Sequence, residues 1–337
     1  MKQKVKIAIL GYGHIGRKHA EMVLQNQDYH LVALIDPKFK SENLDQNISV
    51  DHFTSLQDFL QSDISADVIA ICTPNGLHYE QTKLIVEKGI HAIIEKPITL
   101  NSEEAQELEQ LAARNKVHLF PVMQNRFSPP ALWLKSLMES KVLGKIFMVQ
   151  ISCFWNRNDQ YYTKESWRGT KALDGGTLYT QFSHYLDIMY WLFGDITNIK
   201  SKFADFNHAE LTEFEDSGIV TFDFEKGGMG SFSFSTSVWQ ENLESSLTII
   251  AENGSVKVGG QYMNTIEKCL IKDYSQPNLP ETGLPNDYGT YKGSAQNHHL
   301  LYDNISDFLA QGIAMQTTTD DSIQVLQMIE NMYASNI

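Results

Sequence analysis

The chain has few of the features that mark secreted, membrane-spanning or nucleic-acid-binding proteins. Its three cysteines, Cys72, Cys153 and Cys269, are far apart and form no CxxC pair, so we expect neither a disulfide framework nor a metal site. No apolar run approaches the roughly 20 residues that cross a bilayer. A formal net charge of −14 disfavours nucleic acid and anionic membranes as partners, and it repels anionic substrates unless arginine or lysine gathers locally. These absences favour a cytoplasmic protein.

The length of 337 residues exceeds what one hydrophobic core usually serves, which favours two domains. In the first part, short β-branched runs alternate with amphipathic stretches, a pattern typical of a parallel sheet covered on both faces. Ser102 is the expected N-cap of the last helix in this part. We predict a doubly wound α/β domain over residues 1–122, with strands at 5–10, 30–35, 67–72, 91–95 and 117–122 and helices at 14–27, 55–62, 76–88 and 102–115.

The pattern changes after residue 128, where longer alternating strands are joined by glycine-containing turns. We predict an α+β domain over residues 123–337 with a large, open, mostly antiparallel sheet. Its expected helices are 129–140, 177–193, 295–311 and 321–335, and its expected strands are 146–155, 217–224, 228–239, 246–252, 254–259 and 265–272.

A glycine-rich turn follows the first strand and opens the first helix. It reads Gly11-Tyr12-Gly13-His14-Ile15-Gly16, and the second strand ends at Asp36, twenty residues beyond the last glycine. In this context GxGxxG is the dinucleotide fingerprint, in which a helix N-terminus faces the pyrophosphate and the carboxylate binds the ribose hydroxyls. Asp36 favours NAD, whereas nearby Lys38 keeps NADP open as the less favoured cofactor.

Two further motifs follow strands at the edge where open parallel sheets bind ligands. One is Thr73-Pro74-Asn75 with His78 shortly after it, and the other is Glu95-Lys96-Pro97. A lysine in such a position faces the ligand crevice, so we expect Lys96 to be functional rather than a solvated surface residue.

Together these motifs resemble the Gfo/Idh/MocA oxidoreductases. The resemblance covers essentially the whole chain through GYGHIG, CTPNGLH, EKP, VMQNRF (122–127) and DGGTLYTQFSHYLD (174–187). It implies a Rossmann domain, NAD(P)-dependent hydride transfer at a sugar or polyol carbon, and homodimers or homotetramers built through the open sheet. The cofactor contacts that it implies are Gly11, Tyr12, Gly13, His14, Ile15, Gly16, Asp36, Thr73, Pro74, Asn75, His78, Glu95, Lys96, Gln124, Trp167 and Arg168.

The resemblance also implies catalytic roles. His184 would take the proton of a substrate hydroxyl, and Lys96 would stabilise the alkoxide that develops. Asp187 shares a helical face with His184 and would either orient it or support the core. Many family members carry an aspartate where this chain has Thr180, four residues before the histidine. Threonine cannot act as a base near pH 7, so we expect His184 and Lys96 to carry the acid–base work alone, or the reaction to be lost.

Residues 154–194 resemble the branch of the family that serves bacterial surface polysaccharides and lipopolysaccharide. Those enzymes oxidise the C3 hydroxyl of UDP-N-acetylglucosaminuronic acid, whose carboxylate and diphosphate suit arginine. Tyr161 is a further candidate for stacking on uracil or sugar. The expected substrate contacts are Lys96, Arg126, Arg157, Tyr162, Thr180 and His184, with Arg168 as an alternative to its cofactor role.

Two other functions stay open. The first is an NAD(P)-dependent dehydrogenase of a free sugar or polyol, and the second is a non-catalytic NAD-binding sensor. Two conspicuous clusters have ordinary structural interpretations: the adjacent His298 and His299 point about 100° apart on a helix, and the acidic segment 210–217 is expected to be a solvated turn.

Overall fold

The computed structural model describes residues 4–38, 50–164, 166–287, 289 and 291–337. Two structural units make up the chain. The first comprises the chain up to Val122 together with His298–Ile323, and the second comprises Met123–Asn297 and Gln324–Ile337. The prediction placed everything after residue 122 in the second domain. Helix α8 (His298–Gln311) instead belongs to the first unit, because it packs on α1 (His14–Gln25) and buries Leu301, Tyr302 and Ile305 there.

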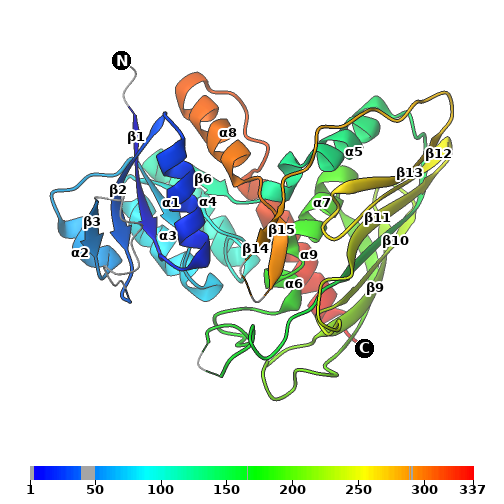
Figure 1. Cartoon of the computed structure of the whole chain (residues 1–337), viewed down its shortest axis with the longest axis horizontal. Coiled ribbons are helices and arrows are strands. Elements are labelled where there is room, and N and C mark those ends of the chain that lie inside the picture. The colour runs from blue at the N-terminus through cyan, green and yellow to red at the C-terminus, as the bar shows by residue number, and fades with distance from the viewer. Residues whose placement is uncertain (1–3, 39–49, 165, 288, 290) are drawn as a thin grey trace. The chain divides into compact units, whose positions relative to one another are not determined.

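The first unit is built on a parallel sheet of six strands in the order β3-β2-β1-β4-β5-β6 among the described residues (Figure 1). This is the strand order of a dinucleotide-binding fold, and it confirms the predicted fold class. The prediction missed the three-residue strand β3. The strands are β1 (Val5–Leu10), β2 (Tyr29–Ile35), β3 (Asp51–Phe53), β4 (Val68–Ile71), β5 (His91–Ile94) and β6 (Leu119–Pro121), and further helices are α2 (Leu56–Gln61), α3 (His78–Glu87) and α4 (Ser102–Asn115).

The pairing of β1, β4 and β5 places the loops that follow these strands at one edge of the sheet. Leu10 of β1 pairs with Ile71 of β4, which in turn pairs with Ile94 of β5. The three strands therefore end at the same level, and the glycine loop, Thr73 and Lys96 follow directly. One capping prediction was wrong. Asn101, not Ser102, caps α4, because its side chain accepts hydrogen bonds from the amides of Glu103 and Glu104.

The second unit is built on a seven-stranded sheet in the order β13-β12-β11-β7-β10-β9-β8 among the described residues. Only β7 and β10 pair in parallel there, so the sheet is mostly antiparallel, as predicted. Strand β8 was not predicted. The strands are β7 (Ile146–Phe154), β8 (Ile196–Ala204), β9 (Ser217–Phe224), β10 (Met229–Ser235), β11 (Glu244–Ala251), β12 (Gly254–Gly259) and β13 (Thr265–Ile271), with a small hairpin of β14 (Pro285–Asp287) and β15 (Lys292–Ala295).

Figure 1 shows α5 (Pro129–Ser140), α6 (Thr177–Thr180) and α7 (Ser183–Phe193) along one face of this sheet. The core between them is aromatic: the ring of Phe182 lies 6.1 Å from that of Phe232 and 5.4 Å from that of Phe234. Helix α9 (Thr319–Ala334) ends near α6, where the Tyr333 hydroxyl contacts the Leu178 amide.

Two predictions about loops and helices in this unit need correction. The expected continuous helix 177–193 is interrupted at residues 181–182, so His184 lies in the first turn of α7 and Thr180 in a separate short helix. The acidic segment 210–217 is not a solvated turn. Asp216 is 1% exposed, because its carboxylate accepts hydrogen bonds from the amides of Phe206 and Asn207 and from the Ser217 and Ser237 hydroxyls.

The three cysteines differ in burial. Cys72 and Cys153 are buried free thiols, and Cys269 is a partly buried one. Among the described residues, no helix combines the length and the apolar character that crossing a bilayer requires.

Candidate active site

The glycine loop leaves room for a ligand at one glycine only. Gly11 has a φ of +89°, and a Cβ there would lie 2.8 Å from the Cys72 carbonyl oxygen. A Cβ on Gly16 would lie 1.9 Å from the Gly11 carbonyl oxygen, so both glycines are required by the fold itself. A Cβ on Gly13 would meet no protein atom within 4 Å. This glycine, at the start of α1, keeps the protein surface open where the fingerprint places the pyrophosphate.

Asp36 lies against this loop at the end of β2. One carboxylate oxygen accepts a 2.7 Å hydrogen bond from the Tyr12 amide, and the other accepts one of 2.7 Å from the Lys38 amide. The carboxylate is partly exposed, which leaves lone pairs for ribose hydroxyls, while its charge opposes a 2′-phosphate. His14 is exposed and Ile15 is partly exposed beside it. The residues present therefore fit NAD.

His78 joins the loops that follow β4 and β5. Its ring is fully buried, with Nδ1 2.8 Å from the Pro97 carbonyl oxygen and Nε2 3.0 Å from the Thr73 carbonyl oxygen. Burial lowers the pKa of this imidazole. His78 was predicted as a cofactor contact; its ring lies between the two loops, and a neutral imidazole donates its single N–H to one of the two carbonyl oxygens.

The remaining residues of these two loops differ in exposure. Thr73 and Pro74 are partly exposed, and the Thr73 hydroxyl donates a 2.6 Å hydrogen bond to Gln81. Asn75 is 5% exposed. Lys96 is partly buried, and its backbone amide donates a 3.1 Å hydrogen bond to a carboxylate oxygen of Glu95.

In the second unit, His184 is 2% exposed and is held by a residue of the linker. Its Nε2 lies 3.2 Å from Nε2 of Gln124, which also donates to the Ser294 hydroxyl at 3.2 Å. Gln124 was predicted as a cofactor contact. The geometry places it beside the candidate base, where its amide orients the imidazole. Sequence reasoning missed Ser294, which no motif marked.

Thr180 is connected to a carboxylate that precedes it. Its hydroxyl hydrogen-bonds to the backbone oxygen of Asp174 at 2.9 Å and also to the Asp174 carboxylate. Asp174 is fully buried, and its other carboxylate oxygen accepts a 2.8 Å bond from the Gly169 amide. Thr180 therefore lies beside a buried carboxylate that comes from the loop before α6. Sequence reasoning missed Asp174, although it opens the DGG motif.

Arg126 and Asp187 form a buried ion pair. The guanidinium donates from Nε at 2.8 Å and from Nη2 at 2.6 Å to the two carboxylate oxygens, and both side chains are 1% exposed. Such bidentate geometry balances both charges. Arg126 was predicted as a substrate contact and Asp187 as a possible support for His184 or for the core. The structure places both in a pair that supports the core.

Two other arginines have no carboxylate partner in the described part of the chain, although Arg157 donates from Nη1 to the Asn156 carbonyl oxygen at 2.6 Å and from Nη2 to the Lys292 carbonyl oxygen at 3.2 Å. Arg157 is 3% exposed, and Arg168 is partly buried; no carboxylate of the described residues forms an ion pair with either. Their guanidiniums lie 5.0 and 4.8 Å from the ring centre of Tyr161, and 5.1 and 5.9 Å from that of Tyr291. In the described structure the Nε atom of each arginine is buried without an acceptor. We call these four side chains the arginine–tyrosine cluster.

Neighbouring aromatic residues complete this cluster. The Arg168 guanidinium lies 4.9 Å from the Trp167 ring centre, and its Nη2 donates to the Tyr291 hydroxyl at 3.3 Å. Burial raises the pKa of Tyr291 to about 12, so its hydroxyl keeps a proton to donate. Tyr162, predicted as a substrate contact, is 1% exposed and packs in a core cluster with Phe214. Sequence reasoning missed Tyr291, which lies in a loop without a recognisable pattern.

Comparison with known proteins identifies the family. Residues 5–122 match the model of an oxidoreductase family with an NAD-binding Rossmann fold, and residues 132–257 match the GFO/IDH/MocA C-terminal domain. Among curated relatives, the scyllo-inositol 2-dehydrogenase (NADP(+)) IolW of Bacillus subtilis is 24% identical over 97% of this chain and 92% of its own length.

Two solved structures of WlbA dehydrogenases in complex with NADH and UDP-GlcNAcA are also similar. The one from Bordetella pertussis is 29% identical with a TM-score of 0.86, and 99% of this chain and 96% of that chain align. The one from Chromobacterium violaceum is 30% identical with a TM-score of 0.87, over 99% and 94% of the two chains. With both family models matched and a glycine loop and Asp36 that fit NAD, the chain belongs to the Gfo/Idh/MocA family and is an NAD-dependent sugar dehydrogenase.

Proposed function

We propose that this enzyme oxidises the C3 hydroxyl of UDP-N-acetylglucosaminuronic acid, in the biosynthesis of a bacterial surface polysaccharide or lipopolysaccharide. The observation that carries the proposal is the arginine–tyrosine cluster. Burying a guanidinium without a carboxylate partner costs free energy, and a bound anion offsets that cost. The substrate offers a uronate and a diphosphate, which are anions that guanidinium groups bind well.

The cluster also resolves the problem of net charge. A chain of −14 repels an anionic substrate at long range. Arg157 and Arg168 supply two cations for an anionic group, and the Tyr291 hydroxyl adds a neutral donor. The similarity to WlbA dehydrogenases crystallised with UDP-GlcNAcA supports the same substrate class.

In the proposed reaction, His184 takes the proton of the C3 hydroxyl while the hydride leaves the same carbon, so that a C3 ketone forms. Lys96 donates a hydrogen bond to the hydroxyl oxygen and stabilises the negative charge that develops on it. Gln124 holds the imidazole of His184. The glycine loop and Asp36 would hold NAD, which would supply the hydride acceptor. The proton on His184 is later released to solvent.

A free sugar or polyol is the second candidate substrate, because the inositol dehydrogenase IolW matches nearly the whole chain. The arginine–tyrosine cluster distinguishes the candidates, since a neutral polyol gives the two guanidiniums no anion. A non-catalytic NAD sensor is the third candidate, and it has no use for Lys96 and His184 together.

The deciding experiment titrates the NAD-loaded protein calorimetrically with UDP, UDP-N-acetylglucosaminuronic acid and UDP-N-acetylglucosamine, while NADH absorbance is recorded. We expect micromolar binding of the uronic acid with NADH formation, and weaker binding of the otherwise identical sugar that lacks the carboxylate. Absence of UDP binding would reject the nucleotide-sugar proposal and favour a free sugar or polyol. Binding without NADH formation with any sugar would favour the sensor.

We further infer that the outer face of the large sheet is covered by a second copy of the chain, as a homodimer or homotetramer. Register places Met148, Met229 and Ile250 on one face with the serines of β10, and these three side chains are 42, 56 and 40% exposed. An exposed sheet face of small polar and scattered apolar groups suits self-association. Light scattering on the eluted protein tests this inference, and a monomer mass at micromolar concentration would contradict it.

A further inference from the structure

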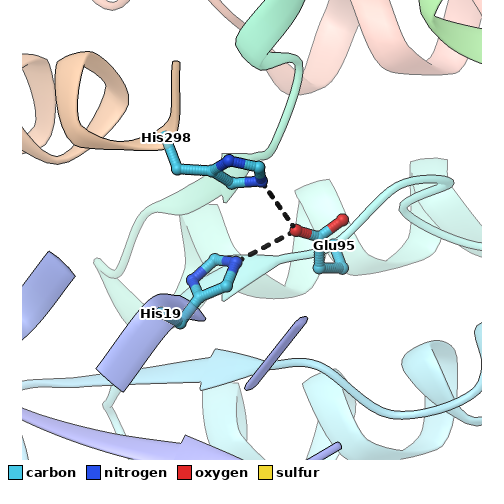
Figure 2. A group of neighbouring side chains, drawn as sticks. All are labelled: His19, Glu95 and His298. Atoms are coloured by element: carbon cyan, nitrogen blue, oxygen red, sulfur yellow. Dashed lines mark hydrogen bonds and ion pairs between the residues drawn. The ribbon is translucent and has the colours of Figure 1, made fainter. Parts of the chain in front are cut away.

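A buried cluster of three titratable side chains lies directly before Lys96. Figure 2 shows His19 from α1, Glu95 after β5 and His298 at the start of α8. Nε2 of His19 lies 3.0 Å from Oε1 of Glu95, and Nε2 of His298 lies 3.5 Å from the same oxygen. The three residues are 0, 7 and 3% exposed.

The geometry describes a clamp on one carboxylate rather than a metal centre. In a zinc site the ligand atoms converge on a point about 2.0–2.2 Å from each of them. Here both imidazole nitrogens are directed at Oε1 of Glu95 itself, as Figure 2 shows. Nδ1 of His19 lies 2.8 Å from the Tyr302 hydroxyl. These contacts fit the neutral tautomer in which Nδ1 of His19 accepts a hydrogen bond from the Tyr302 hydroxyl and Nε2–H donates one to Glu95.

The clamp keeps the Glu95 carboxylate charged. Burial by itself raises the pKa of this carboxyl, but the hydrogen bond from His19 and the nearby His298 imidazole outweigh burial and hold the pKa well below its usual range. The second oxygen of the charged group accepts the backbone amide of Lys96 at 3.1 Å. One carboxylate therefore connects two histidines, from opposite ends of the chain, to the backbone of Lys96.

We propose that His19 and His298 act through Glu95 as positioning residues for Lys96, and that α8 returns to the first unit to complete this support. The proposal rests on the role of Lys96 in the proposed function. Glu95 is then a positioning residue as well, and not the cofactor contact that the family resemblance implied. Loss of either histidine frees the carboxylate to rotate and releases the Lys96 amide.

The test compares His298→Leu, which removes the nitrogen, with His298→Gln, whose amide nitrogen reaches a similar place. His299→Leu is the matched control, because His299 is exposed on the same helix turn. For His298→Leu we expect kcat to fall about tenfold or more while KM for NAD changes less than twofold. His298→Gln should recover most of kcat, and His299→Leu should match the wild type. A lower melting temperature of His298→Leu with unchanged kcat would overturn the proposal.

A second measurement needs no turnover, so it separates this proposal from the proposed function. Acetic anhydride acetylates lysine amines, and mass spectrometry gives the rate at Lys96 relative to exposed Lys88. We expect Lys96 to react at least threefold faster in His298→Leu than in the wild type or in His299→Leu. This result together with a wild type that oxidises no sugar would support the positioning role and reject the proposed function. An unchanged acetylation rate at Lys96 would overturn the positioning role. The role would also be overturned if the purified wild type contained one equivalent of zinc and His298→Gln contained none.

Discussion

The two units treat buried charge in opposite ways. In the first unit, the buried carboxylate of Glu95 is held by two histidines and a backbone amide, so its surroundings complete it. In the second unit, the guanidiniums of Arg157 and Arg168 lie among aromatic rings without an ion-paired carboxylate in the described structure. Arg126, in the same unit, shows the paired alternative.

This difference distinguishes charged side chains that position neighbouring residues from charged side chains that are suited to bind a ligand of opposite charge. A charge completed by the protein fixes the geometry around it, whereas an incomplete one gains free energy when an opposite charge arrives. On this basis we propose that Glu95 and Arg126 belong to the framework, and we keep Arg157 and Arg168 as proposed substrate contacts. The predictions below test these assignments.

Lys96→Ala and His184→Ala should have the largest effects, because each removes a group to which the proposed mechanism gives a role at the reacting hydroxyl. We expect kcat to fall by about 10²–10⁴ in each variant, with the affinity for NAD nearly unchanged. NADH absorbance gives the rate, and calorimetry gives NAD binding. Lys88→Ala is the control for loss of a lysine. A His184→Ala enzyme with most of its rate would remove the histidine from the mechanism.

Arg126→Met and Arg168→Met should sharpen the contrast between paired and unpaired cations. Loss of Arg126 removes the bidentate guanidinium partner of the buried Asp187 carboxylate, so we expect the free energy of unfolding to fall by about 3–5 kcal/mol. Arg168→Met should leave stability nearly unchanged and raise KM for the nucleotide sugar about 10–100-fold. Urea unfolding and steady-state kinetics separate the two effects. Equal destabilisation by both substitutions would contradict the assignment of Arg168 to a ligand.

Asp36→Ala should weaken NAD binding by about tenfold and reduce the discrimination against NADP, because the ribose hydroxyls lose a charged acceptor. The ratio of kcat/KM for the two cofactors measures the change. Lys38→Ala serves as the control in the same loop. If the ratio stays the same in Asp36→Ala, the ribose assignment is wrong.

Glu215 should have the smallest effect, on stability alone. Burial raises its pKa to about 7, while the Tyr333 hydroxyl at 2.7 Å limits the rise. The folded state then binds more protons than the unfolded state between about pH 4.5 and 7, so stability falls as pH rises through this window. Glu215→Gln should remove this fall and melt about 2–4 °C higher at pH 8. If the melting temperatures of the two proteins change with pH in the same way from pH 5 to 8, the raised pKa of Glu215 is contradicted.

Periodicity predicted the local elements well where one face of an element is buried. The helix predicted over 102–115 and the strands over 5–10 and 217–224 occur with the same bounds, because their apolar spacing is unambiguous. The break after Thr180 was missed, because residues 177–193 are apolar almost throughout and such a run gives no signal of interruption. The edge strand β8 was missed for the opposite reason, since its residues are mostly polar or partly exposed.

Residue order by itself determined the cofactor site, because the glycine loop, Asp36 and the strand-end motifs belong to consecutive β–α units whose geometry is local. It also pointed to Lys96 and His184. Only the tertiary structure decided which charged side chains have a partner within the protein. Asp187 pairs with Arg126 across 61 positions, His298 reaches Glu95 from the far end of the chain, and Tyr291 lies 123 positions from Arg168. Such pairings depend on which elements pack together, and no spacing along the sequence encodes that.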